Sequence, residues 1–176
     1  MIVIHAVKKL LNVSRLEAPL MIPNPDPGQL MFQWYASLIS TGFRGKLMII
    51  YVHYPSLLTV ICRSRTLQTS WKEFEQRING LLIRHNFSTE LIQTEIGLMK
   101  DYVVSKTNNR SMLAHMNQMI MYLEALCKRY HNYSEIQEDF LEDTMMNYLY
   151  QSGNMAKPYT TPIDYWNEKG VVRPRR

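Results

Sequence analysis

Alternating apolar residues mark the first clear elements along the chain. Residues 32–39 (FQWYASLI) alternate in the way of a strand with one strongly buried face, made of Phe32, Trp34, Ala36 and Leu38. A helix with Leu30, Trp34 and Leu38 on one side is the alternative. Beyond a turn sequence, residues 47–52 and 57–62 are short, apolar and rich in β-branched residues. Together these segments predict a three-strand antiparallel meander.

Two further segments have the composition of strands, MIVIH at residues 1–5 and YVVSK at residues 102–106. Residues 18–29 carry four prolines and a glycine, which excludes a regular helix or a central strand and predicts a surface loop. With the helices described next, these segments predict an α+β fold. We expect an antiparallel sheet of four to five strands covered by helices, in a single domain over residues 1–176.

Helical spacing begins after the meander. Residues 70–85 place Trp71, Phe74, Ile78 and Leu81 on one face, and Ser70 with Glu73 forms a capping-box pattern. A shorter helix is expected from Ser88 or Thr89 to Leu98. The spacing from residue 110 to Tyr130 predicts a third helix, with Thr107, Asn108 or Asn109 as its N-cap. Its predicted core face consists of Leu113, Met116, Ile120, Leu123, Cys127 and Tyr130.

The C-terminal part shows two more helix starts. Ser134 and Gln137 predict a capping box for a helix whose acidic residues, from Glu135 to Asp143, are expected to form a solvated face. Residues 152–176 are expected to form a tail with a short docked helix. Its start signal is Thr161 as N-cap followed by Pro162 at the first helical position, and Tyr165 and Trp166 are expected to dock it.

Composition narrows the class of protein. The chain is 46% hydrophobic and 20% charged, as in ordinary globular proteins, and its two cysteines are expected to be buried thiols in a reducing compartment. The apolar residues at the N-terminus precede the lysines, the reverse of a secretory signal, and other apolar runs are too short to span a membrane. We therefore expect a soluble cytoplasmic protein without a membrane segment.

The formal charge of +5 raises the question of nucleic-acid binding. Three of the 20 basic residues lie in the terminal VVRPRR, which leaves 17 basic against 15 acidic residues in the rest of the chain. The body of the protein is therefore nearly neutral. A solvated arginine tail is favoured over a nucleic-acid-binding arm.

One polar cluster stands out at the start of the third helix, and it consists of Arg110, Ser111, His115 and Asn117. Ser111 and His115 are expected on the solvent side, whereas Asn117 is expected to be at least partly buried and to tie the helix to a loop. The sequence contains no glycine-rich phosphate loop, no GxSxG, no HExxH and no pair of His or Cys at metal-ligand spacing. It therefore predicts no catalytic residue, metal or cofactor.

The segments KKLL, WYASL and RSMLAHMN resemble a family of uncharacterised bacterial and phage-encoded proteins, a domain of unknown function. The resemblance covers residues 1–125 and rests on an Arg-Ser pair that precedes a Met-Asn pair by a fixed interval. The matching positions are Trp34, Arg110, Ser111, Met116 and Asn117. It implies a small cytoplasmic protein without an assigned activity.

Two hypotheses about function remain after these observations. The first is a non-enzymatic interaction module that binds a protein partner or a second copy of itself, because the chain is apolar and aromatic-rich and has no catalytic constellation. The alternative is an enzyme or nucleic-acid-processing factor with a polar pocket around Arg110 and Asn117, in which the arginine binds phosphate or carboxylate.

Overall fold

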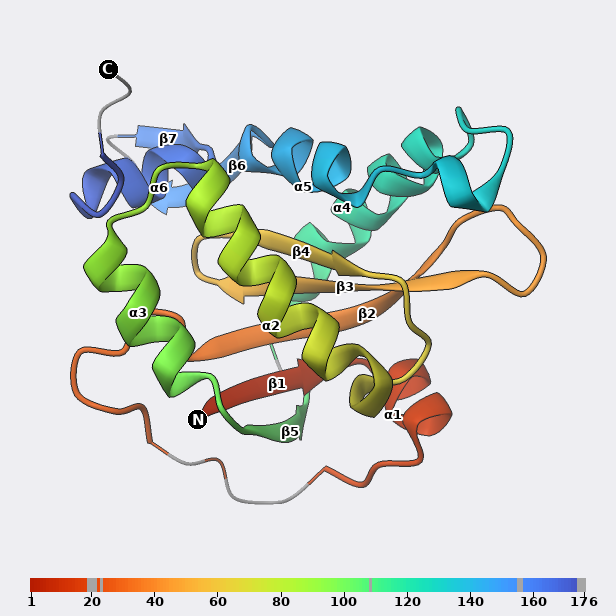
Figure 1. Cartoon of the computed structure of the whole chain (residues 1–176), viewed down its shortest axis with the longest axis horizontal. Helices are drawn as coiled ribbons and strands as arrows, with labels where there is room; N and C mark the ends of the chain where they lie inside the picture. The colour runs from red at the N-terminus through yellow and green to blue at the C-terminus, as the bar shows by residue number, and fades with distance from the viewer. Residues whose placement is uncertain (19–21, 23, 108, 155–156, 174–176) are drawn as a thin grey trace.

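A mixed five-stranded sheet runs through the middle of the computed structural model, which describes residues 1–18, 22, 24–107, 109–154 and 157–173 (Figure 1). In spatial order the strands are β4 (Thr59–Cys62), β3 (Leu47–Tyr54), β2 (Gln33–Ser40), β1 (Ile2–Ala6) and β5 (Tyr102–Lys106). The expected meander is confirmed, since β2, β3 and β4 are antiparallel neighbours. β1 runs parallel to both β2 and β5.

The expectation of a purely antiparallel sheet was therefore wrong for β1 and β5. A short turn can join two antiparallel neighbours. Two parallel strands need a longer crossover connection, because the chain must return to the end of the sheet at which the first strand began. The helix at residues 8–14 lies in the connection from β1 to β2, and the helices at residues 67–84 and 89–98 lie in the connection from β4 to β5, at the opposite edge of the sheet. The apolar pattern of a strand shows which side chains are buried, but it does not show the direction of the neighbouring strand.

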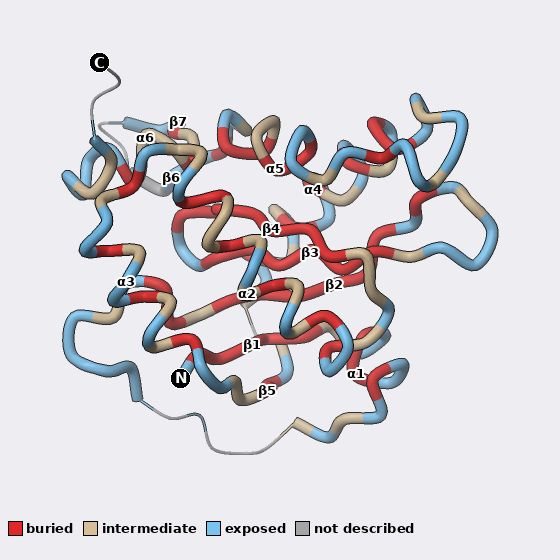
Figure 2. Tube along the Cα trace, viewed as in Figure 1, coloured by how far each residue is buried: buried red, intermediate tan, exposed pale blue. Residues whose placement is uncertain are grey.

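Helices cover both faces of the sheet. On one face lie α1 (Lys8–Ser14), α2 (Leu67–Arg84) and α3 (Thr89–Leu98), and on the other lie α4 (Arg110–Cys127) and α5 (Glu138–Met146). Figure 1 shows α2 in front of the strands and α4 behind them. Buried residues concentrate on the strands and on the inner sides of the helices (Figure 2).

This two-sided cover explains why β2 has no solvent-facing side. Trp34 belongs to the core beneath α2, and its neighbour Tyr35 belongs to the core beneath α4. The sequence pattern predicted only one strongly buried face for this strand. Strands with helices on both faces have near-continuous apolar runs, so alternation is weak where both sides are covered.

The remaining elements follow α4. They are the 3-10 turn η1 (Tyr133–Glu135), the hairpin of β6 (Tyr150–Asn154) and β7 (Lys157–Thr160), and α6 (Pro162–Glu168). The hairpin was not anticipated from the sequence. The expected docked helix is confirmed as α6, in which Trp166 is buried against Phe87 and His53. Of the predicted loop 18–29, the described residues lie in neither helix nor strand, and residues 19–21 and 23 fall outside the described part.

Three predicted helix starts are confirmed by side-chain caps. Ser88 accepts a hydrogen bond from the backbone N–H of Leu91 at the start of α3, and Asn109 accepts one from Met112 at the start of α4. Thr161 caps α6 in the same way. A short polar side chain before an apolar period located these starts to within one to three residues, and the structure selects Ser88 and Asn109 from the candidates.

The capping box predicted at Ser70 was wrong. α2 begins one turn earlier, at Leu67, and Thr66 is its N-cap. Ser70 is instead fully buried, and its hydroxyl lies 2.5 Å from the hydroxyl of Tyr51. Glu73 accepts a hydrogen bond from the backbone N–H of Arg63. Ser70 and Glu73 have the spacing of a capping box, but the same spacing also occurs inside a helix. Only the packed structure shows which of the two applies.

The expectation of a solvated acidic face holds for Glu135 and Asp139, which are exposed, but it was wrong for Glu142. Glu142 is fully buried, where it accepts hydrogen bonds from Arg77, from Arg84 and from the backbone N–H of Ile61 on the edge strand β4. Its neighbour Asp143 binds Arg84 and His85. The capping box at this end of the chain belongs to Asn132 and Glu135 of η1, not to Ser134 and Gln137.

The predicted core face of α4 was rotated from the observed one. Met116, Leu123 and Cys127 are buried as expected, whereas Leu113 and Ile120 are only half-buried. The other buried positions of this helix are Met112, Met119 and Leu126. Both cysteines, Cys62 and Cys127, are buried free thiols. Within the described ranges, no helix is both long and apolar enough to cross a membrane.

His53 is a fully buried histidine between the rings of Trp34 and Trp166. Its Nε2 lies 3.0 Å from the carbonyl oxygen of Leu30 and its Nδ1 lies 2.7 Å from the hydroxyl of Ser56. A carbonyl can only accept, so Nε2 carries the proton and Nδ1 accepts from Ser56. Burial lowers the pKa of His53 to about 3.

We expect His53 to make folding acid-sensitive. Below pH 6.5, the ordinary pKa of histidine, the unfolded chain takes up a proton at residue 53 that the folded state excludes. The free energy of unfolding therefore decreases as the pH is lowered from 6.5 to about 3. The expected loss between pH 7 and pH 5 is about 2 kcal/mol. Urea denaturation at both pH values measures it. His53→Gln should reduce this dependence by the contribution of one buried histidine, whereas His131→Gln, at an exposed histidine, should leave it unchanged; equal slopes in all three proteins would contradict the assignment.

Candidate functional site

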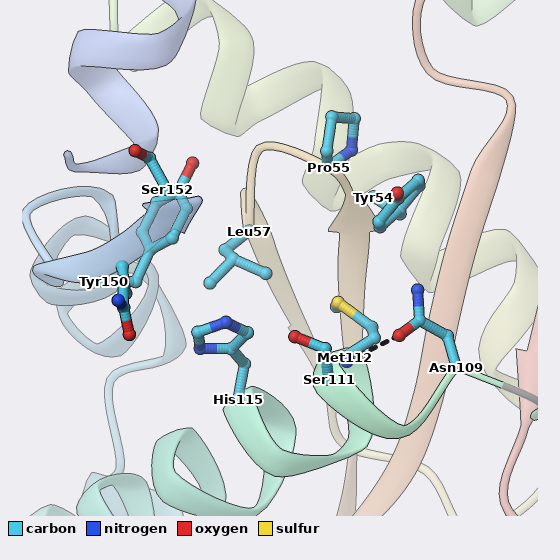
Figure 3. A pocket seen from close by; sticks show the side chains of 10 residues that line it. Tyr54, Pro55, Leu57, Asn109, Ser111, Met112, His115, Tyr150 and Ser152 are labelled. Carbon is cyan, nitrogen blue, oxygen red and sulfur yellow. Dashed lines mark hydrogen bonds between the residues drawn. The ribbon is translucent and has the colours of Figure 1, made fainter. Parts of the chain in front are cut away.

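A cavity of about 310 Å³ opens beside the start of α4 (Figure 3). Three segments that are distant in the sequence meet there. The β3–β4 turn contributes Tyr54, Pro55 and Leu57, the start of α4 contributes Asn109, Ser111, Met112 and His115, and β6 contributes Tyr150, Gln151 and Ser152. The cavity is thus a product of tertiary packing.

The first turns of α4 determine how its polar side chains face the cavity. Ser111 and His115 are four residues apart, so they lie one above the other on the same side of the helix. Asn109 is fixed by its N-cap bond, 3.0 Å from its Oδ1 to the backbone nitrogen of Met112, and its amide nitrogen points away from the helix (Figure 3). Leu57 and Met112 supply apolar surface between these polar groups.

The cavity is electrically neutral near pH 7. The ring of His115 meets the ring of Tyr150 edge-on, with centroids 6.0 Å apart, and burial lowers the pKa of His115. Burial raises the pKa of Tyr150. No Asp, Glu, Lys or Arg occurs among the described lining residues. These groups can therefore donate and accept hydrogen bonds, but they offer no charge to a ligand.

A second cavity, of about 260 Å³, adjoins the first and shares Pro55, Tyr150 and Ser152 with it. It continues past Tyr165 and Thr160 to Lys157 and Glu168, which form an ion pair. We call the two cavities together the tyrosine groove, after Tyr54, Tyr150 and Tyr165. The groove runs from the start of α4 to α6.

The structure separates the four residues of the predicted polar cluster. Ser111 and His115 line the groove, whereas Arg110 and Asn117 do not. Asn117 is exposed, so the expectation that it is partly buried was wrong. Among the described residues, neither Arg110 nor Asn117 has a side-chain hydrogen bond or ion pair. Trp34 is fully buried in the core beneath α2 and does not line the groove.

Sequence reasoning singled out Tyr165, as a residue that docks the C-terminal helix, but it missed Tyr54 and Tyr150. Tyr54 is the last residue of β3, directly before a turn that begins with a proline. Tyr150 is the first residue of a hairpin that no alternation of apolar residues predicted. The signal that could have found them is the abundance of tyrosine, since the chain has 11 and several of them lie outside the predicted core faces. No group of three or more His, Cys, Asp or Glu side chains suited to a metal ion occurs in the part of the chain that the structure describes.

A comparison with protein families matches residues 3–165 to a family described as Domain of unknown function (DUF6933). The chain belongs to the DUF6933 family. The resemblance to an uncharacterised family is thus confirmed, and the DUF6933 match extends beyond residue 125 into α6. It includes the sheet, both helical layers and most of the tyrosine groove. No curated protein matches the chain in sequence.

Proposed function

We propose that the protein is a binding module that takes a short, uncharged segment of a partner protein into the tyrosine groove. The observation that carries this proposal is the composition of the groove: three tyrosines, a neutral histidine, and the amide and hydroxyl groups of Asn109 and Ser111 over an apolar floor. This combination is typical of protein-recognition surfaces.

Tyrosine suits recognition because its ring gives a large contact area at low entropic cost while its hydroxyl makes a directed hydrogen bond. Serine and asparagine add adaptable hydrogen bonding around such anchors. Tyr54 and Tyr165 are at least partly accessible, and Tyr54 is 41% exposed. These side chains can therefore make new contacts without opening the core.

The shape and charge of the groove favour a peptide segment with uncharged side chains. Two adjoining cavities of about 310 and 260 Å³ accommodate successive side chains better than one compact molecule. The charged pair at one end, Lys157 and Glu168, is internally neutralised. A charged segment would lose hydration in the groove without gaining an opposite charge.

The enzymatic alternative has less support. It relied on Arg110 as a clamp for phosphate or carboxylate and on Asn117 as a neighbour in one pocket, and neither residue lines the groove. His115 has no carboxylate partner among the described lining residues. A general base in a triad-like arrangement is oriented by such a partner.

Selection from a random peptide library against the whole protein tests the proposal. We expect enriched peptides with aromatic or proline residues, and we expect Ser111→Trp to weaken their binding at least about tenfold because the indole fills the groove. Ser111 is exposed, so this substitution leaves the core intact. Fluorescence polarisation with the labelled peptides gives the dissociation constants.

Asn117→Trp is the matched control, because Asn117 is exposed on the same helix but away from the groove. It should change the dissociation constants by less than about twofold. Failure to enrich any peptide, or equal binding by both tryptophan variants, would contradict the proposed function.

A further inference from the structure

A separate cavity, of about 530 Å³, lies at the carboxyl ends of the parallel strands β1 and β5. It shares no lining residue with the tyrosine groove. Its lining includes the polar residues Lys8, Asn12, Lys106 and Thr107. Leu11 and Leu16 form an apolar part of the wall.

The position of this cavity follows from the topology of the sheet. β1 and β5 are adjacent and parallel, yet the helices that follow them leave to opposite faces. Leu10 and Leu11 of α1 pack in the core beneath α2, whereas Met112 and Met116 of α4 pack in the core on the other face. Chains that diverge in this way leave a crevice outside the strand ends, which is where sheets of this kind bind ligands.

The charges in the crevice favour an anion. Lys106 is the last residue of β5 and Lys8 is the first residue of α1, so two ammonium groups come from the two diverging chains. Both lysines are exposed and have no ion-pair partner among the described residues. Glu17 is the one carboxylate among the described lining residues, which leaves a net charge of +1 on the lining.

We propose that this crevice binds a phosphorylated small molecule of mononucleotide size. Lys8 and Lys106 bind the phosphate as point charges, and Asn12 and Thr107 donate hydrogen bonds to it. Leu11 and Leu16 contact a flat ring, and Glu17 accepts hydrogen bonds from hydroxyl groups. A cavity of about 530 Å³ lies in the size range of small-molecule sites.

Titration calorimetry of the whole protein with the four common nucleoside 5′-monophosphates tests the site. At least one should bind with a dissociation constant below about 1 mM. The Lys8→Gln/Lys106→Gln double variant should bind it at least about tenfold more weakly, because both charge-assisted contacts are lost. Lys100→Gln is the matched control, since this exposed lysine precedes the other end of β5 and should leave binding unchanged.

Two further probes separate the phosphate from the ring. The corresponding nucleoside should bind at least about tenfold more weakly than the monophosphate, and inorganic phosphate should compete only weakly. The proposal is overturned if no monophosphate binds the parent protein, if the double variant binds as tightly as the parent, or if inorganic phosphate competes as well as the nucleotide. None of these outcomes depends on the tyrosine groove.

Discussion

Glu142→Ala is expected to lower the free energy of unfolding by about 3–5 kcal/mol. The carboxylate of Glu142 is fully buried and accepts three hydrogen bonds, at 2.8 Å from Arg77, 2.8 Å from Arg84 and 3.0 Å from the backbone nitrogen of Ile61. Removing it leaves two guanidinium groups without their buried partner and one backbone N–H of β4 unpaired. Chemical denaturation of the two proteins measures the difference.

Asp139→Asn provides the matched control. Asp139 lies on the same helix and binds the same two arginines, but its side chain is 61% exposed. Exposed ion pairs contribute little, so this variant should lie within about 1 kcal/mol of the parent. If Glu142→Ala were no more destabilising than Asp139→Asn, the buried network would not be what attaches α5 to α2.

Trp34→Ala is expected to be similarly costly, at about 3–5 kcal/mol. The indole is fully buried, meets the ring of Phe74 edge-on with centroids 5.0 Å apart, and lies beside His53. Its Nε1 donates a hydrogen bond to the carbonyl oxygen of Met31, at 2.9 Å. Alanine would leave a large cavity and an unpaired carbonyl at the start of β2.

Two other variants separate the contributions of volume and hydrogen bonding. Trp34→Phe keeps much of the ring but loses the donor to Met31, and it should cost about 1–3 kcal/mol. Trp71→Ala removes another ring that contacts Phe74, but Trp71 is only half-buried and should cost less than Trp34→Ala. Thermal and urea denaturation both report these values. A reversed order of the two alanine variants would refute the central role of Trp34.

Glu142 and Trp34 stabilise the parts of the fold that position the tyrosine groove. Glu142 joins α5 to α2 across the edge of β4, and Trp34 supports β2 near the turn that presents Tyr54. Loss of either residue should therefore weaken binding at the tyrosine groove indirectly. Comparison at matched stability is needed to distinguish this effect from that of Ser111→Trp.

The amino-acid sequence by itself determined the local elements of this protein. Apolar alternation located β2, short apolar runs rich in β-branched residues located β3 and β4, and segments with the composition of strands located β1 and β5. Short polar side chains located the starts of α3, α4 and α6 to within one to three residues. These features depend on contacts within a few residues. The local pattern of side chains is therefore sufficient to predict them.

Only the tertiary structure decided the direction of β1 and β5 and the environment of individual polar residues. Glu142 and Asp139 are both acidic residues of one helix, yet one is fully buried between two arginines and the other is exposed. His115 and Asn117 lie two residues apart, yet one lines the groove and the other faces solvent. Burial and partners depend on segments distant in sequence, and neither the groove nor the crevice exists until those segments meet.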